Sequence, residues 1–307
     1  MHQLNLATIF YLVVATALWA GNAIAGRLLV GTISPITLST VRWGLAALIL
    51  LPFGWRIFKR DSALWQNKTR FVFLGLFGVG SYNALLYLAL QTSTPINVTL
   101  IGASMPIWML LIGTVFYKVH PTFLQIIGAV VSLFGVALVL TRGEISALLS
   151  MQLVSGDLLI MLATILWAAY SWMLSHPGKS PERQWPWADF LMAQILVGLV
   201  WTLFFDSFEM ARGHAFLNLN LFSASLILFV AIGPSLIAYR CWGLGVHGAG
   251  PTVAAFFANL IPLFTALLSA AMLGEPPKLF HGLAFALIVT GILVSSSKPK
   301  VNKSKVS

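Results

Sequence analysis

Ten long apolar stretches run through this chain of 307 residues, and they constrain its fold more than any other feature. Each is close to the roughly 20 residues that a helix needs to cross the hydrocarbon core of a bilayer. Only 8% of the residues are charged, whereas a soluble domain has about 25%. The sequence therefore predicts an all-α integral membrane protein with ten transmembrane helices. They are expected at residues 7–29, 35–53, 70–90, 95–117, 122–140, 156–175, 188–205, 221–242, 250–273 and 279–294.

The rest of the chain offers little room for anything else. The connections between the stretches are short, so we expect no soluble domain. The opening MHQLNL lacks the positive charge of a signal peptide, and the first stretch is long enough to span, so it is expected to remain as a helix. The single Cys241 cannot form an intramolecular disulfide.

Positive charges are distributed unevenly between the two sides of the predicted membrane. With the N-terminus in the cytoplasm, 12 of the 18 Lys and Arg fall on the cytoplasmic side and 4 on the outer side, while Arg42 and Arg240 lie inside stretches. An excess of Lys and Arg in cytoplasmic loops is typical of polytopic proteins, so we expect a multi-pass protein with both termini in the cytoplasm. This topology accounts for the net charge of +10. Without a basic face rich in aromatics, we expect no nucleic-acid partner.

The second half of the chain repeats the first. The sequence ATALWA at residues 15–20 returns as ATILWA at residues 163–168, 148 positions later. Four further residues return at an offset of 156, namely Pro95, Pro106, Pro121 and Gly135 as Pro251, Pro262, Pro277 and Gly291. We therefore expect a first five-helix repeat at 1–145, a second at 146–297 and a basic cytoplasmic tail at 298–307.

An odd number of helices per repeat has a consequence for orientation. With five spans in the first half, the second half must enter the membrane from the other side. Inverted repeats are a recurrent plan of secondary transporters, in which the substrate lies near the midplane between the halves. The duplication could also be only a packing solution, but the repeat and the topology together favour transport.

Several short motifs resemble those of a known family. They are LWAGNAIAGR at residues 18–27, the Arg42-Trp43 pair, Pro106 and Pro262, and LGEPP at residues 273–277. In this order the chain resembles the EamA branch of the drug/metabolite transporter superfamily. The resemblance implies ten helices in two repeats and the export or exchange of amino acids, metabolites or drugs across a bacterial inner membrane. The chain departs from the family where Val119 stands in the place that Glu275 occupies in the second half.

Polar and aromatic side chains occupy matched positions in the two halves. Trp19 and Asn22 share a helix face, and adding 148 leads to Trp167 and Tyr170. Such side chains at bilayer depth should face protein or a cavity, so the matching favours a substrate site between the halves, although each residue alone could merely bridge helices. The predicted substrate-binding residues are Trp19, Asn22, Arg42, Tyr82, Asn83, Tyr87, Trp108, Trp167, Tyr170, Tyr239 and Asn259.

Two prolines and one arginine inside the stretches have alternative interpretations. Pro106 and Pro262 each remove a helical hydrogen bond, so the freed carbonyls could line a cavity beside Asn259, or the helices could simply kink. Arg42 could bind an anionic group of the substrate. It could also reach the outer interface or clamp helix ends through backbone carbonyls, and we favour this structural role.

Motifs for other functions are missing from the sequence. The six His show no i, i+4 pairing and no GxSxG or Walker motif is present, so we expect no enzyme, no cofactor and no metal site. All eight acidic residues fall in loops or near stretch ends, which argues against cation–proton exchange on a midplane carboxylate. We predict a secondary transporter, an exporter or exchanger of a small metabolite such as an amino acid or nucleobase-like compound, working by alternating access in the bilayer as a monomer or homodimer. A membrane-embedded enzyme and a channel are the alternatives.

Overall fold

The computed structural model spans residues 1–307 and describes residues 4–60, 62–89, 92–93, 95–144, 146, 153–176, 185–273 and 278–297. Within these ranges, ten helical spans are long and apolar enough to cross a membrane. This confirms the predicted all-α membrane fold. The predicted tail at 298–307, Glu275 and the side chain of Tyr87 lie outside the described residues.

The first half supplies five spans. Residues 55–58 and 63–66 add short helical turns, η1 and α3, between the second and third spans. In chain order the spans are α1 (Leu6–Leu28), α2 (Pro35–Gly54), the third span of α4 (Lys68–Leu74), η2 (Gly75–Ser81) and α5 (Tyr82–Ala89), the fourth of α6 (Pro95–Gly102) and α7 (Met105–Tyr117), and α8 (Phe123–Leu140).

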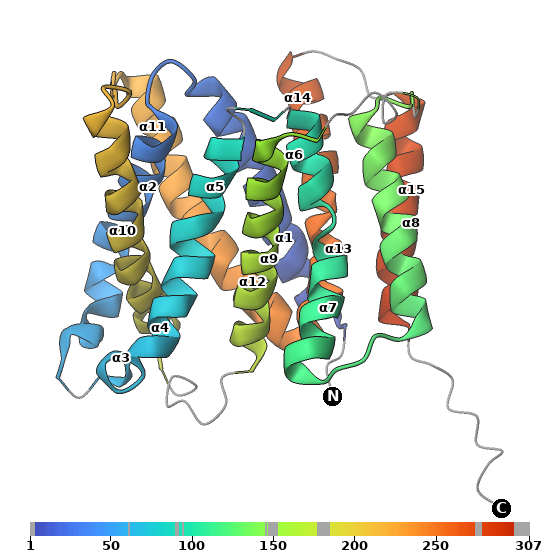
Figure 1. Ribbon diagram of the computed structural model, residues 1–307, viewed down its shortest axis with the longest axis horizontal. Helices are drawn as coiled ribbons and strands as arrows, with labels where there is room; N and C mark the ends of the chain where they lie inside the picture. The colour runs from blue at the N-terminus through green and yellow to red at the C-terminus, as the bar shows by residue number, and fades with distance from the viewer. Residues whose placement is uncertain are drawn as a thin grey trace, which may run out of the picture.

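The second half repeats this pattern of continuous and broken spans. Its elements are α9 (Ser155–Ser175), α10 (Trp187–Ala211), the eighth span of α11 (Leu221–Val230), η5 (Ala231–Ile237) and α12 (Ala238–Ala249), the ninth of α13 (Pro251–Ala258) and α14 (Leu260–Leu273), and α15 (Leu279–Ser296). Figure 1 shows that α1 begins and α15 ends on the same side of the bundle, here called the terminal face. The other side is called the opposite face.

Pro106 and Pro262 break their spans where the sequence predicts a break. α6 ends at Gly102, four residues before Pro106, and α13 ends at Ala258, four residues before Pro262. A proline ring clashes with the carbonyl four residues earlier and donates no hydrogen bond to it, so the helix cannot continue unchanged. The fourth and ninth spans are therefore each two helices in succession.

Two spans extend well past their apolar stretches. α10 continues to Ala211 rather than 205, and α12 to Ala249 rather than 242. The end of α12 is rich in glycine, which allows close packing on α1: a Cβ on Gly245 would lie 2.3 Å from Leu12, and one on Gly248 would lie 2.4 Å from Thr8. The length of an apolar stretch does not reveal such contacts, so it does not predict where α12 ends.

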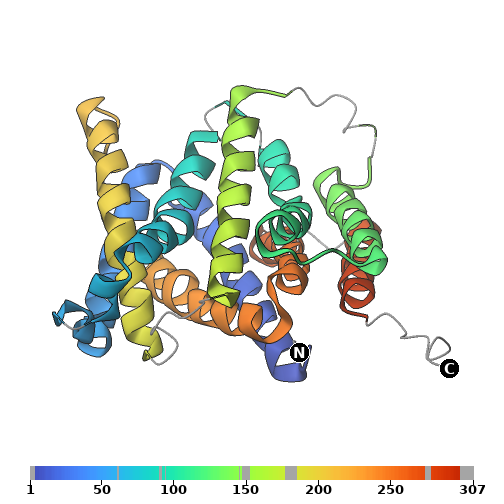
Figure 2. The same cartoon turned by 60° about the horizontal axis from the view of Figure 1, so that its bottom comes forward.

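Contacts between the halves occur in exchanged pairs. α1 packs on α12 and α14, while α9, its counterpart, packs on α5 and α7. Likewise α10 packs on η2 and α2 packs on η5. The pairs α2·α10 and α8·α15 join equivalent spans and stand at opposite edges of the bundle in both views (Figures 1 and 2). In Figure 1, α1 runs away from the terminal face and α9 runs toward it. These contacts and directions fit the predicted inverted repeat.

The α8–α15 pair is held together by small residues. A Cβ on Gly128 would lie 2.7 Å from the carbonyl of Gly291, and one on Gly135 would lie 3.0 Å from that of Ala284. Adding 156 to Gly128 and Gly135 gives Ala284 and Gly291, so these two contacts are equivalents of each other. Small residues allow close backbone approach, which drives helix association in lipid.

Two π-helical turns interrupt the third and eighth spans at matched positions. η2 begins at Gly75 and η5 at Ala231, which is 156 residues later, and both turns contain seven residues. A π-helical turn widens the helix by shifting the hydrogen bonds to i+5, and such turns are frequent at functional sites. They bring the backbone of both halves to the centre of the bundle.

Candidate functional site

Seven aromatic rings meet between the two halves, and we call this set the aromatic cluster. The rings come from α1, α2, α5, α9 and α12, so both halves contribute. Five members are among the residues predicted from the sequence, and two, Trp43 and Trp242, are not. The members are Trp19, Trp43, Tyr82, Trp167, Tyr170, Tyr239 and Trp242.

Trp167 lies at the centre of the aromatic cluster. Its ring centroid is 5.3 Å from that of Trp19, 5.5 Å from Tyr82 and 5.1 Å from Tyr170. It is also 5.6 Å from Tyr239 in an edge-to-face arrangement. Rings at these separations attract one another beyond simple burial. Trp19 and Tyr82 are only partly buried, so the cluster retains some accessible aromatic surface.

The two π-helical turns each present a backbone carbonyl to this cluster. The hydroxyl of Tyr239 donates a hydrogen bond to the carbonyl of Gly78 in η2. The indole Nε1 of Trp19 donates to the carbonyl of Pro234 in η5, at 3.2 Å. Gly78 and Pro234 are 156 residues apart and are therefore equivalent positions of the two halves. Each half thus offers one acceptor, which an aromatic donor from the cluster satisfies.

Gly78 is also required by the packing of the cluster. A Cβ at this position would lie 2.5 Å from the ring of Tyr170. Any other side chain would push Tyr170 away and would separate η2 from α9. Gly78 therefore allows η2 to approach Tyr170 closely, and its carbonyl accepts the hydrogen bond from Tyr239.

Arg42 lies beside the cluster and connects three spans. Its side chain is 2% exposed. Nε donates to Ser235 Oγ at 3.1 Å and Nη1 donates to Asn22 Oδ1 at 3.3 Å. The guanidinium carbon is 5.0 Å from the ring centroid of its neighbour Trp43, a cation–π distance. Arg42 and Asn22 are thus brought together, and Arg42 contacts η5 rather than the outer interface.

The other predicted residues lie away from the cluster or have no described contact with it. Trp108 donates from Nε1 to Ser104 Oγ at 3.0 Å, within the break of the fourth span. Asn259 donates to Ser132 Oγ of α8 at 2.8 Å and so faces the α8–α15 pair. Asn83 is buried in α5. For Tyr87 only the backbone, within α5, is described.

Sequence reasoning missed four members of this arrangement. Trp43 and Trp242 have no aromatic equivalent in the other half, so the matching of positions does not select them. Gly78 and Pro234 act through backbone carbonyls, which leave no side-chain signal. The internal Pro234 could have marked the eighth span as irregular.

Three described carboxylates, those of Asp157, Asp206 and Glu209, accept hydrogen bonds from the other half of the chain. On the opposite face, Asp206 Oδ1 accepts from Thr37 Oγ1 at 2.7 Å, and Glu209 Oε2 accepts from Thr37 N at 3.1 Å. Asp157, at the start of α9, accepts from Ser93 after α5. On the terminal face, Arg70 Nη2 donates to the Met173 carbonyl at 2.8 Å. Polar contacts therefore connect the two halves at both ends of the interface.

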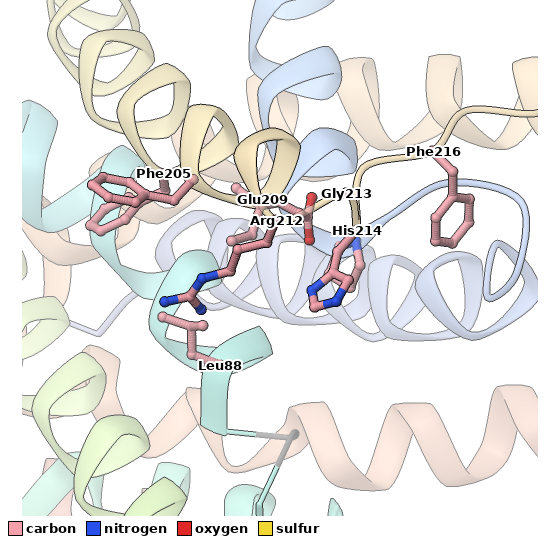
Figure 3. A pocket seen from close by; sticks show the side chains of 10 residues that line it. Leu88, Phe205, Glu209, Arg212, Gly213, His214 and Phe216 are labelled. Carbon is pink, nitrogen blue, oxygen red and sulfur yellow. The ribbon is translucent and has the colours of Figure 1, made fainter.

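A hollow of about 680 Å³ lies at the opposite face, away from the aromatic cluster. The end of α10 and the loop after it line one side, while the start of α2 and the end of α5 line the other (Figure 3). Its lining residues are Pro35, Ile36, Leu88, Phe205, Phe208, Glu209, Arg212, Gly213, His214 and Phe216. Among the described residues there is no cluster of three or more possible metal ligands here or elsewhere.

Known proteins share both the sequence pattern and the fold. The pattern of the EamA-like transporter family matches residues 6–141 and 154–297. Similar proteins include the uncharacterized transporter YyaM of Bacillus subtilis (strain 168), at 28% identity over 89% of this chain and 88% of the relative. An uncharacterized transporter of Archaeoglobus fulgidus is 25% identical over 96% of this chain and 99% of its own. A solved crystal structure, 19% identical, has a TM-score of 0.75 and covers 94% of this chain and 97% of its own.

Proposed function

Because the chain belongs to the EamA-like transporter family and is a membrane transporter, we propose that it is a secondary transporter whose substrate binds at the aromatic cluster. The substrate is a small metabolite with an aromatic or amphipathic body, such as an amino acid or a nucleobase-like compound. The protein exports or exchanges it across a cell inner membrane, with both termini in the cytoplasm, as a monomer or homodimer.

The observation that carries this proposal is the pair of equivalent carbonyls at Gly78 and Pro234. Each already accepts a hydrogen bond from an aromatic donor, Tyr239 or Trp19. A substrate N–H or O–H that replaces either donor would find a preformed acceptor, and its apolar body would stack on the rings of the cluster. Irregular backbone at membrane depth is tolerated where it lines a binding cavity, which supports a role for both turns in binding.

Alternating access would arise from the contacts that close the two faces. Separating α2 from α10 at the opposite face breaks the hydrogen bonds of Thr37 with Asp206 and Glu209. Separating the third span from α9 at the terminal face breaks the bond between Arg70 and Met173. Because the halves are equivalent, the two openings are expected to have similar free energies, as alternating access requires. A substrate that rearranges the cluster would then be released to either side.

Counterflow in proteoliposomes tests this proposal. The purified protein is reconstituted, loaded with pooled unlabelled amino acids, nucleobases or polyamines, and assayed for uptake of the labelled pool with and without a pH gradient. We expect uptake of one pool, and we expect Trp167→Ala and Asn83→Ala to reduce it while folding is retained. Trp55→Ala, at an exposed indole outside the cluster, is the matched control. Normal uptake in both the Trp167→Ala and the Asn83→Ala variant would contradict the site.

A further inference from the structure

The hollow at the opposite face is not part of the proposed substrate site. Backbone hydrogen bonds hold the segments that line it. α10 ends in a motif in which Gly213 N donates to the Met210 carbonyl at 2.9 Å and His214 N donates to the Glu209 carbonyl at 3.0 Å. Gly213 has φ of +71°. This is the pattern of a Schellman cap, in which glycine adopts the left-handed conformation. Arg212 and His214 are therefore attached to a fixed helix end.

The loop that follows is fixed as well. Ser34 N donates to the Phe216 carbonyl at 3.0 Å, and Asn218 N donates to the Thr32 carbonyl at 2.7 Å. Ile33 and Leu217 form an antiparallel bridge between these two segments. The first and seventh connections thus pair across the halves, and the hollow they border has a defined shape.

The charges that line the hollow are not balanced by one another. The carboxylate of Glu209 accepts hydrogen bonds from Thr37 N and, at 3.3 Å, from Thr37 Oγ1. It is therefore engaged at the start of α2, where the helix dipole favours a negative group. Arg212 is one turn further along α10, and it forms no ion pair with any described residue. In Figure 3 its guanidinium extends away from Glu209 and toward Leu88.

Arg212 is exposed, and apolar side chains line the hollow beside its guanidinium. Phe205 and Phe208 lie on the preceding turns of α10, and Leu88 lies at the end of α5. A guanidinium binds planar oxyanions through paired N–H donors, and aromatic walls favour an apolar body attached to the anion. A 680 Å³ hollow is within the usual size range of small-molecule sites.

We propose that this hollow binds the oxyanion of an amphipathic molecule, with Arg212 as the residue that pairs with the anion and Phe205, Phe208 and Leu88 as the apolar wall. Two sources have this chemistry: a free organic carboxylate and the phosphate group of an anionic lipid. The site lies apart from the aromatic cluster, so its occupancy does not depend on the proposed substrate or on transport.

Direct binding to the purified full chain in a neutral detergent tests the proposal. The soluble probes are 3-phenylpropionate and its uncharged amide, followed through the melting temperature of the protein. The lipid probes are phosphatidylglycerol and phosphatidylcholine, followed by native mass spectrometry. The variants are Arg212→Gln and Arg212→Lys. Arg142→Gln is the matched control, because Arg142 also ends a helix, α8, and is exposed.

We expect one anionic probe to bind the wild type in preference to its uncharged or zwitterionic partner. Arg212→Gln should weaken this binding at least about tenfold, the scale of a lost charge-assisted pair. Arg212→Lys, which keeps the charge but loses the paired N–H donors, should bind more weakly than the wild type and more tightly than Arg212→Gln. This order separates loss of charge from misfolding, and Arg142→Gln should leave binding unchanged. Selective binding of phenylpropionate identifies a carboxylate site, and selective binding of phosphatidylglycerol identifies a lipid site. No preference for either anion, or equal loss in the Arg142 and Arg212 variants, would overturn the proposal.

Discussion

The hydroxyl of Tyr239 in α12 donates a hydrogen bond to the carbonyl of Gly78 in η2, so a side chain of the second half satisfies a backbone acceptor of the first. The equivalent carbonyl in the second half, that of Pro234, receives its hydrogen bond from Trp19 of the first half. The two halves therefore cap each other's π-helical turns.

This relationship predicts the effect of removing the Tyr239 hydroxyl. Tyr239→Phe keeps the ring contacts and deletes one hydrogen bond, whose net worth is about 0.5–1.5 kcal/mol. Because a substrate donor would no longer have to displace this hydroxyl from the Gly78 carbonyl, we expect the half-saturating substrate concentration in counterflow to fall by roughly two- to tenfold. The free energy of unfolding should fall by about the worth of the lost bond. Tyr117→Phe is the control, because Tyr117 stacks on Trp172 outside the cluster. Equal effects of the two substitutions would argue against a role for the Gly78 carbonyl.

A second prediction concerns Arg42, whose described contacts favour the structural role. Arg42→Met leaves Asn22 Oδ1 and Ser235 Oγ without the bonds they now receive. Ser235 Oγ keeps its bond to the Val230 carbonyl and Asn22 is only partly buried, so we expect the loss of these charge-assisted bonds to lower the free energy of unfolding by about 1.5–3 kcal/mol. The contacts among α1, α2 and η5 should loosen. Thermal unfolding in detergent measures the loss. If the variant kept the wild-type melting temperature but lost substrate affinity, Arg42 would instead be a binding residue.

The contact between α8 and α15 allows a comparison within one helix. Gly291→Ala places a Cβ 2.7 Å from the Gly128 carbonyl, whereas Gly282→Ala meets nothing within 4 Å. We expect the first to destabilise the fold by about 1–3 kcal/mol, the usual cost of overpacking. The second should be neutral or slightly stabilising, since alanine favours a helix over glycine by up to about 1 kcal/mol. Melting curves of the two variants test this difference. A Gly291→Ala variant as stable as the wild type would show that α8 and α15 can move apart enough to accommodate the added methyl group.

Asn259 gives a fourth prediction, because it faces α8 rather than the aromatic rings. Asn259→Ala removes the hydrogen bond to Ser132 Oγ and should lower stability by about 1–2 kcal/mol. The half-saturating substrate concentration in counterflow should stay at the wild-type value. A shift in that concentration without loss of stability would return Asn259 to the binding site that the sequence suggested.

Much of this fold could be predicted because it depends on the length of the apolar stretches, on the positions of prolines and on the internal repeat. Apolar length locates the ten spans, and the positions of Pro106 and Pro262 locate two helix breaks. Trp19 and Trp167 occupy matched positions of the two halves, and equivalent residues of inverted halves face the same interface. Their rings are accordingly in contact. These features depend on local composition or on the repeat alone.

The rest depends on contacts that no local pattern encodes. The segments GLFGVGS and AIGPSLI share no residue at equivalent positions, yet both form π-helical turns. When Pro35 is aligned with Pro186, at an offset of 151, Trp43 corresponds to Gln194, and at the offset of 156 Trp242 corresponds to Leu86. The repeat therefore gives no reason to select either tryptophan. The long end of α10 is held by hydrogen bonds of Asp206 and Glu209 to α2, which follow from tertiary packing rather than from hydrophobicity.

The measurement that tests the account most directly is transport with the opposite face held shut. In a Cys241→Ser background, which removes the single native thiol, Thr37→Cys and Glu209→Cys are joined by a short cleavable thiol cross-linker. The two residues are in direct contact, with Thr37 N and Glu209 Oε2 3.1 Å apart. The variant carrying only Thr37→Cys, treated identically, is the control. Alternating access predicts that cross-linking stops counterflow and that cleaving the linker restores it, whereas unchanged counterflow in the cross-linked protein would contradict alternating access between these two halves.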